Sequence, residues 1–148
     1  MTFYFTPLNF RDISNKTFLS SEPFLTDPYE TQMVEVRASN IAKAGQGVFL
    51  KQTVLKNTIV SYFNGVRRKE EDVFDSTKMF NKKSPYIVEI GEMDDFLDIP
   101  QDLAKWDKYQ ASTGHKVNHD RVANGRFSEC EHPRFGTILC LVTLKVSY

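Results

Sequence analysis

The sequence predicts a mostly β fold built from small twisted sheets with one or two short helices. Its apolar residues gather in short runs rich in β-branched and aromatic side chains, and glycine and asparagine residues that favour turns separate these runs. Only residues 102–112 place several apolar side chains at helical spacing. Short strands joined by tight turns are typical of domains in which β-sheets dominate.

The first half of the chain is expected to contain three strands. Residues 1–28 are interrupted by three prolines and have no helical period, so we expect short extended pieces and turns there. A loop is expected at residues 39–47, and the Asn64-Gly65 pair predicts a tight turn. The expected strands are residues 33–38, 48–50 and 58–63.

The second half is expected to contain short helices and three more strands. Residues 68–79 are charged and make at best a short helix. Residues 102–112 predict an amphipathic helix that Asp102 caps, with Leu103, Trp106 and Tyr109 on its apolar face. The expected strands are residues 86–90, residues 96–99 and the apolar run 137–146, which suits a buried strand.

Composition indicates one globular domain and argues against several classes of function. The chain has 148 residues, and its 41% hydrophobic content is too high for wholesale disorder. Nineteen basic residues balance nineteen acidic ones, which argues against a protein that binds the nucleic-acid backbone. The basic run 67–69 is expected to be a solvated turn. No apolar run is long enough to span a membrane, and the first residues do not form a signal peptide.

Two cysteines, Cys130 and Cys140, stand ten positions apart without a Cys-x-x-Cys pattern. This spacing does not support a disulfide scaffold. We therefore expect both thiols to be reduced and Cys140 to be buried as a small apolar residue.

Residues 114–136 form the most unusual stretch of the chain. They contain all three histidines and three of the seven glycines. Asn118, Asp120 and Asn124 can bond to their own backbone and so favour turns over strands. We expect a surface loop there, with free backbone donors that can hold a polar ligand.

A zinc site is the alternative interpretation of this stretch. Two of its histidines have the i, i+4 spacing of helical metal ligands, and a Cys-x-His pair follows. However, the glycine and asparagine residues disfavour a helix, and Cys-x-His is too short a spacing for common structural zinc sites. We therefore expect no metal. The four candidate ligands are His115, His119, Cys130 and His132.

Five motifs, in their order and spacing, resemble the SET domain of protein-lysine methyltransferases. The similarity is greatest to the branch that carries MORN repeats and monomethylates lysine four of histone H3 and several non-histone proteins. It runs from about Leu25 to Val146. The motifs are Asp27-Pro28-Tyr29-Glu30, Ala44-Gly45-Gln46-Gly47-Val48-Phe49, Tyr62-Phe63-Asn64-Gly65-Val66-Arg67, Gly114-His115-Lys116-Val117-Asn118-His119 and His132-Pro133-Arg134-Phe135-Gly136.

The resemblance implies a SET β-clip and S-adenosylmethionine as cofactor. It implies that Ala44, Gly45, Gln46 and Lys116 offer backbone groups to the methionine end of this cofactor. By the same resemblance the side chain of Asn118 would bind the amino group, and the backbone of His119 would bind the adenine. A ligand with a carboxylate, an ammonium and a sulfonium needs several fixed polar partners.

The resemblance also implies a narrow channel for the substrate lysine. The family lines this channel with tyrosines, but the order is swapped here to Tyr62-Phe63, so that the channel position falls on Phe63. The second channel tyrosine corresponds to Phe127. Loss of two hydroxyls is expected to alter how many methyl groups are added and how well the amine is held.

The resemblance further predicts the domain organisation and the partners. Residues 1–32 are expected to be a connector similar to the end of a MORN or pre-SET region, and residues 33–148 a partial SET domain with an incomplete pseudoknot segment. The implied substrates are the histone H3 tail or another lysine-bearing protein, and the implied location is the nucleus, with the cytoplasm as a further possibility. The alternative function is a catalytically inactive, truncated module that binds a peptide or the cofactor without turnover.

Overall fold

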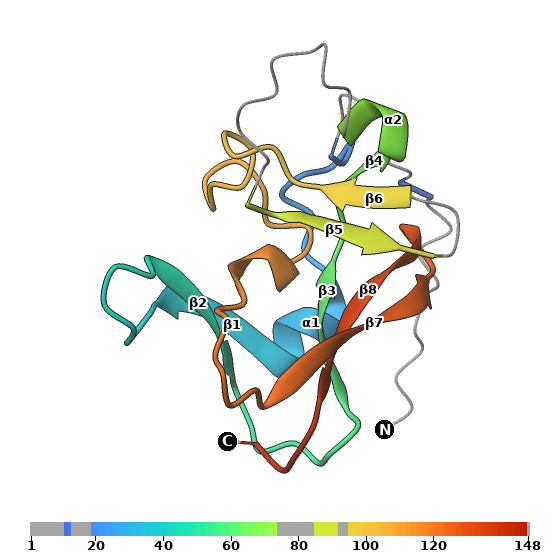
Figure 1. Cartoon of the computed structure of the whole chain (residues 1–148). Coiled ribbons are helices and arrows are strands. Elements are labelled where there is room, and N and C mark those ends of the chain that lie inside the picture. Colours follow the sequence, from blue (N-terminus) through green and yellow to red (C-terminus); the bar gives the residue numbers. More distant parts are fainter. Residues whose placement is uncertain (1–10, 13–18, 74–84, 92–94, 148) are drawn as a thin grey trace.

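The computed structural model describes residues 11–12, 19–73, 85–91 and 95–147. In this part of the chain the strands form three small antiparallel sheets (Figure 1). The first sheet pairs β1 (Val34–Ala38) with β2 (Gln46–Leu50). The second has the order β3-β8-β7, with β3 at Ile59–Phe63, β7 at Gly125–His132 and β8 at Gly136–Thr143. The third has the order β4-β6-β5, with β4 at Val66–Lys69, β5 at Ile87–Ile90 and β6 at Asp95–Asp98.

Helical structure in the described residues is limited to short pieces. They are α1 (Pro28–Met33), α2 (Glu70–Val73) and the 3-10 helix η1 (Gly114–Lys116). The prediction of a mostly β fold is thus confirmed, and the expected strands correspond to β1, β2, β3, β5, β6 and β8. The described part contains no helix that is long and apolar enough to cross a membrane.

Helix α1 corrects the expectation of extended pieces through residue 28. The side chain of Asp27 accepts a hydrogen bond of 2.8 Å from the Glu30 N–H, and Pro28 occupies the first turn. Proline costs little there, because the first N–H groups of a helix have no intrahelical partner. Pro28 therefore begins a helix instead of interrupting one. The expected domain boundary at residues 32/33 falls inside the last turn of α1 and stays a prediction.

The amphipathic helix expected at residues 102–112 is wrong, because this segment forms successive turns. The N–H groups of Leu103 and Ala104 both donate to the Pro100 carbonyl. A helix this short depends on burying a continuous apolar face. Of the expected face, Tyr109 is 1% exposed, whereas Leu103 and Trp106 are only half-buried.

Two further expectations are corrected by strands. Residues 125–132 do not belong to a loop but form β7, which pairs with β8 along its whole length. The basic run 67–69 is not a turn but lies in β4, where Arg68 forms an ion pair of 2.7 Å with Asp98 of β6. Of the expected short helix at 68–79, residues 70–73 form α2, and residues 74–79 lie outside the described part.

Two apolar clusters form the core. The larger one joins the sheets β3-β8-β7 and β4-β6-β5 through residues such as Phe63, Leu97 and Ile138. The smaller one lies beneath the β1–β2 hairpin and consists of Met33, Val34, Val54 and Val60. Both cysteines are free thiols and Cys140 is buried, as expected.

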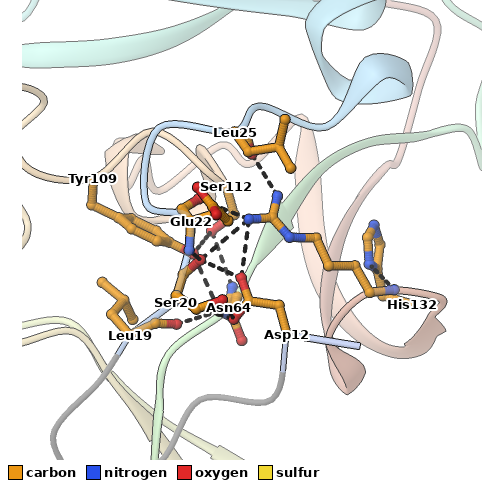
Figure 2. Close-up of polar contacts among 11 residues, drawn as sticks. Asp12, Leu19, Ser20, Glu22, Leu25, Asn64, Tyr109, Ser112 and His132 are labelled. Carbon is orange, nitrogen blue, oxygen red and sulfur yellow. Dashed lines mark hydrogen bonds and ion pairs between the residues drawn. The ribbon is translucent and has the colours of Figure 1, made fainter. Parts of the chain in front are cut away.

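Arg134, which is 2% exposed, attaches the N-terminal part of the described chain to the turn between β7 and β8. Figure 2 shows the N-terminal residues that surround its side chain, among them Asp12, Ser20, Glu22 and Leu25. Its guanidinium group donates to Asp12 Oδ2 at 3.0 Å, to the Glu22 carbonyl at 2.8 Å and to the Leu25 carbonyl. The Asp12 carboxylate also accepts from Ser20 and Ser21. This network fixes the chain that leads into α1.

Candidate functional site

The loop at residues 39–45 and the loop at residues 117–124 meet at one point of the structure. The Ser39 N–H donates to the Gly45 carbonyl at 2.8 Å and thereby closes the first loop. The Asn118 amide donates to Ser39 Oγ at 2.9 Å and thereby joins the second loop to the first. A Cβ at Gly47 would lie only 2.8 Å from Asn118 Nδ2, so a side chain at position 47 would displace the Asn118 amide.

A cavity of about 250 Å³ lies where these loops meet. Polar side chains of Ser39, Asn118, Asp120 and Asn124 line it together with apolar side chains of the smaller core cluster and of β8. A cavity with both kinds of lining suits a ligand that carries polar groups on an apolar body. The apolar lining includes Val34, Val48, Leu50, Val60 and Leu141.

A smaller hollow of about 170 Å³ shares part of this lining and extends it to Phe127. The two hollows have Asn118, Asp120 and Leu141 in common, and His119 lines the smaller one. The loop that carries Asn118 and His119 therefore adjoins β7, where Phe127 lies.

The structure brings Phe63 and Phe127 together across β8. Their ring centroids are 5.8 Å apart and their planes are nearly perpendicular. Phe63 is 4% exposed and Phe127 is 37% exposed, so that the pair extends from the core to the surface. Edge-to-face contact of this kind is favourable and holds the two rings in a fixed arrangement.

Tyr62 does not join this pair, because successive side chains of a strand point to opposite faces. Its ring makes an edge contact with His132 at a centroid distance of 4.6 Å. Burial, together with the negative charge of Asp27, raises the pKa of Tyr62. Its hydroxyl therefore stays protonated at neutral pH.

The remaining sequence-predicted residues do not line the larger cavity, and only His119 among them lines the smaller hollow. Ala44 is half-buried. Gly45 is exposed and has a φ of +67°, and Gln46 is the first residue of β2. Lys116 is the last residue of η1, which packs against β2 and β3. Burial lowers the pKa of the Lys116 side chain. His119 is exposed.

The four candidate zinc ligands do not gather. In the described residues, no group of three or more His, Cys, Asp and Glu side chains could hold a metal ion. His115 is buried beside Tyr109, at a centroid distance of 5.7 Å, and burial lowers its pKa to about 4. His132 instead contacts Asp27.

Three side chains without a role predicted from the sequence organise this region. Ser39 holds Asn118, as described above. Asp27 Oδ2 contacts His132 Nε2 at 3.2 Å. Burial raises the pKa of Asp27, but the hydrogen bonds from His132 and from the Glu30 N–H outweigh burial and lower this pKa. Glu30 is 1% exposed. Burial raises the pKa of Glu30, although several hydrogen bonds to its carboxylate act to lower it. The Asp-Pro-x-Glu pattern, a helix-start signal, could have identified the last two.

Comparisons with known proteins find relatives of the chain among curated proteins. No family model matches the chain. The chain is 36% identical over 135 residues to the histone-lysine N-methyltransferase SETD7 of Halocynthia roretzi, and the alignment covers 90% of this chain and 34% of that protein. The chain thus spans about a third of the length of this relative. The similarity supports the SET-domain family.

The fold agrees with this similarity. Small antiparallel sheets joined by short connections, with few helical residues, are consistent with a SET-like β-clip. The alignment covers only about a third of the relative, so the similarity concerns that part of the relative alone. Membership of the MORN-bearing branch stays a prediction.

Proposed function

We propose that the chain contributes the cofactor site and the lysine channel of a protein-lysine methyltransferase that uses S-adenosylmethionine. The observation that carries the proposal is the Asn118–Ser39 contact, which joins the two loops around a cavity next to Phe127. The similarity to SETD7 supports the reaction class.

The residues present fit this cofactor. Its adenosine and its charged methionine end need apolar and polar walls respectively, and the cavity has both. The backbone at Ala44, Gly45 and Gln46, together with the backbone of Lys116, would hold the methionine end. The Asn118 side chain would accept from the ammonium group, and the His119 backbone would hold the adenine. The cofactor supplies an electrophilic methyl group when it is bound.

Phe63 and Phe127 would confine the substrate lysine. Their apolar rings exclude water and disfavour a charged ammonium, so that the amine that attacks is neutral. Confinement aligns the amine nitrogen with the methyl group and thereby lowers the entropic part of the barrier. Because neither ring carries a hydroxyl, the amine is oriented by shape alone at these two positions. We expect the number of methyl groups added to differ from that of tyrosine-lined relatives.

The finer assignments are part of the same proposal. We propose the histone H3 tail, at lysine four, as the first substrate to test and a non-histone protein with an exposed lysine as the second. We also propose a place in the MORN-bearing branch and a nuclear location. The balanced formal charge supports a protein substrate over a nucleic acid.

The test is methyl transfer from labelled S-adenosylmethionine to a histone H3 peptide, with the same peptide carrying arginine in place of the lysine as a control. The proposal expects label on the lysine peptide, and it expects Asn118→Ala to reduce transfer strongly at limiting cofactor concentration. Leu55→Ser is the matched control, because Leu55 is 72% exposed and does not line the cavity. A folded chain that binds peptide or cofactor but transfers no label would instead support the non-catalytic module.

A further inference from the structure

One oxygen of Glu30 accepts hydrogen bonds from two separate parts of the proposed site. Oε1 accepts from the Tyr62 N–H at 2.7 Å and from Ser61 Oγ at 2.9 Å, both on β3. The same atom accepts from the Thr113 N–H at 3.1 Å and from Thr113 Oγ1 at 2.6 Å. Thr113 immediately precedes η1, and Tyr62 immediately precedes Phe63. Glu30 therefore joins the strand of the lysine channel to the segment of the cofactor residues.

The rest of α1 is fixed against the same sheet (Figure 1). The Tyr29 hydroxyl donates to the Ile59 carbonyl at the start of β3, at 2.7 Å. Asp27 contacts His132 at the end of β7, the strand that carries Phe127. Helix α1 and its N-cap residue Asp27 thus contact β3, the end of β7 and the segment that leads into η1. The Glu30 carboxylate therefore has little freedom to move.

The packing of Gly114 shows independently that this spacing is tight. A Cβ at Gly114 would lie 2.6 Å from the Tyr62 carbonyl oxygen and 2.8 Å from Phe63 Cβ. Main chain therefore approaches main chain at the point where both N–H groups share the Glu30 oxygen. A shift of either segment would change the distance between Phe63 and the loop that carries Asn118.

We propose that Glu30 is a positioning residue, which sets the distance between the lysine-channel strand and the cofactor-binding segment through its Oε1 atom. The effect of this spacing on catalysis rests on the proposed function. The spacing between β3 and residues 113–119 can itself be measured without turnover.

The experiment compares Glu30→Gln with Glu30→Leu in isotope-labelled chain. Glutamine keeps a carbonyl oxygen for the same donors, whereas leucine removes it at similar volume. Ile90→Ala is the control, because Ile90 is buried in β5 and does not line the cavity. Two quantities are measured on folded samples: the nuclear Overhauser effect between Gly114 Hα and Phe63 Hβ, and the calorimetric affinity for S-adenosylmethionine.

The proposal expects Glu30→Leu to lose the nuclear Overhauser effect and to weaken cofactor binding by about tenfold or more. Glu30→Gln and Ile90→Ala should keep both within about threefold. If Glu30→Leu does not fold, Thr113→Val replaces it, with Thr113→Ser as its control, because valine removes only the hydroxyl donor.

A folded Glu30→Leu variant with wild-type contact and affinity would overturn the inference, as would equal losses in Ile90→Ala. If the wild-type chain does not bind the cofactor, the proposed function fails, and the Gly114–Phe63 contact alone decides whether Glu30 sets the spacing.

Discussion

Gly47→Ala tests whether Asn118 holds the cofactor. The added Cβ would lie 2.8 Å from Asn118 Nδ2 and 3.3 Å from the Phe49 ring. Ordinary contact begins near 3.4 Å, so the Asn118 amide must move by about 0.6 Å. Because the atom that moves ends a flexible side chain, the fold itself should change little.

A shift of about 0.6 Å in the Asn118 amide is large compared with the range of distances over which a hydrogen bond forms. The 2.9 Å bond from Asn118 to Ser39 Oγ would approach the limit at which such bonds are lost. A hydrogen bond between the Asn118 carbonyl oxygen and the cofactor ammonium would contribute about 1.5–3 kcal/mol. Its loss would raise the dissociation constant for S-adenosylmethionine by about 10- to 100-fold.

The assay is calorimetric titration of wild type and Gly47→Ala with S-adenosylmethionine. Gly91→Ala is the control, because Gly91 does not line the cavity, although its φ of +72° disfavours alanine. Gly91→Ala should bind as wild type does, even though it is less stable. Wild-type affinity in a folded Gly47→Ala variant would refute the role assigned to Asn118.

Three further predictions concern stability and are measured by urea denaturation. Burial holds the pKa of His115 at about 4, below its ordinary 6.5, so the unfolded chain binds the extra proton between these values. The free energy of unfolding should therefore fall by about 3 kcal/mol from pH 6.5 to pH 4, and the same slope in His115→Gln would contradict this. Gly114→Ala should cost about 2–3 kcal/mol, because main chain at Tyr62 blocks its Cβ, and a loss below about 0.5 kcal/mol would contradict it. Arg134→Met should cost about 3–5 kcal/mol, because the buried Asp12 carboxylate loses its cation, and a neutral effect would show that Asp12 finds another partner.

Much of the fold could be predicted because its strands are encoded locally. The runs at residues 58–63 and 137–146 are rich in β-branched and apolar residues, and they became β3 and β8. Strand β7 could not be found in this way, because glycine and glutamates weaken its local preference. Its ladder with β8 decides its conformation.

The candidate site was only partly predictable for a related reason. The polar residues at 114–124 and the glycines at 45 and 47 identify loops that suit a ligand, and the family resemblance assigns them roles. The contacts that assemble them join residues far apart in sequence: Asn118 and Ser39 are 79 positions apart, and Thr113 and Glu30 are 83 apart. Local patterns do not encode such pairs, so that the contacts of Ser39 and Glu30 emerged only from the structure.

Direct binding of S-adenosylmethionine to the purified chain tests the central claim. The account predicts a single site with a dissociation constant in the micromolar range, about −8 kcal/mol, and a clearly weaker site in Asn118→Ala. Absence of binding by a chain that unfolds cooperatively, and is therefore folded, would contradict the claim that these two loops form a cofactor site.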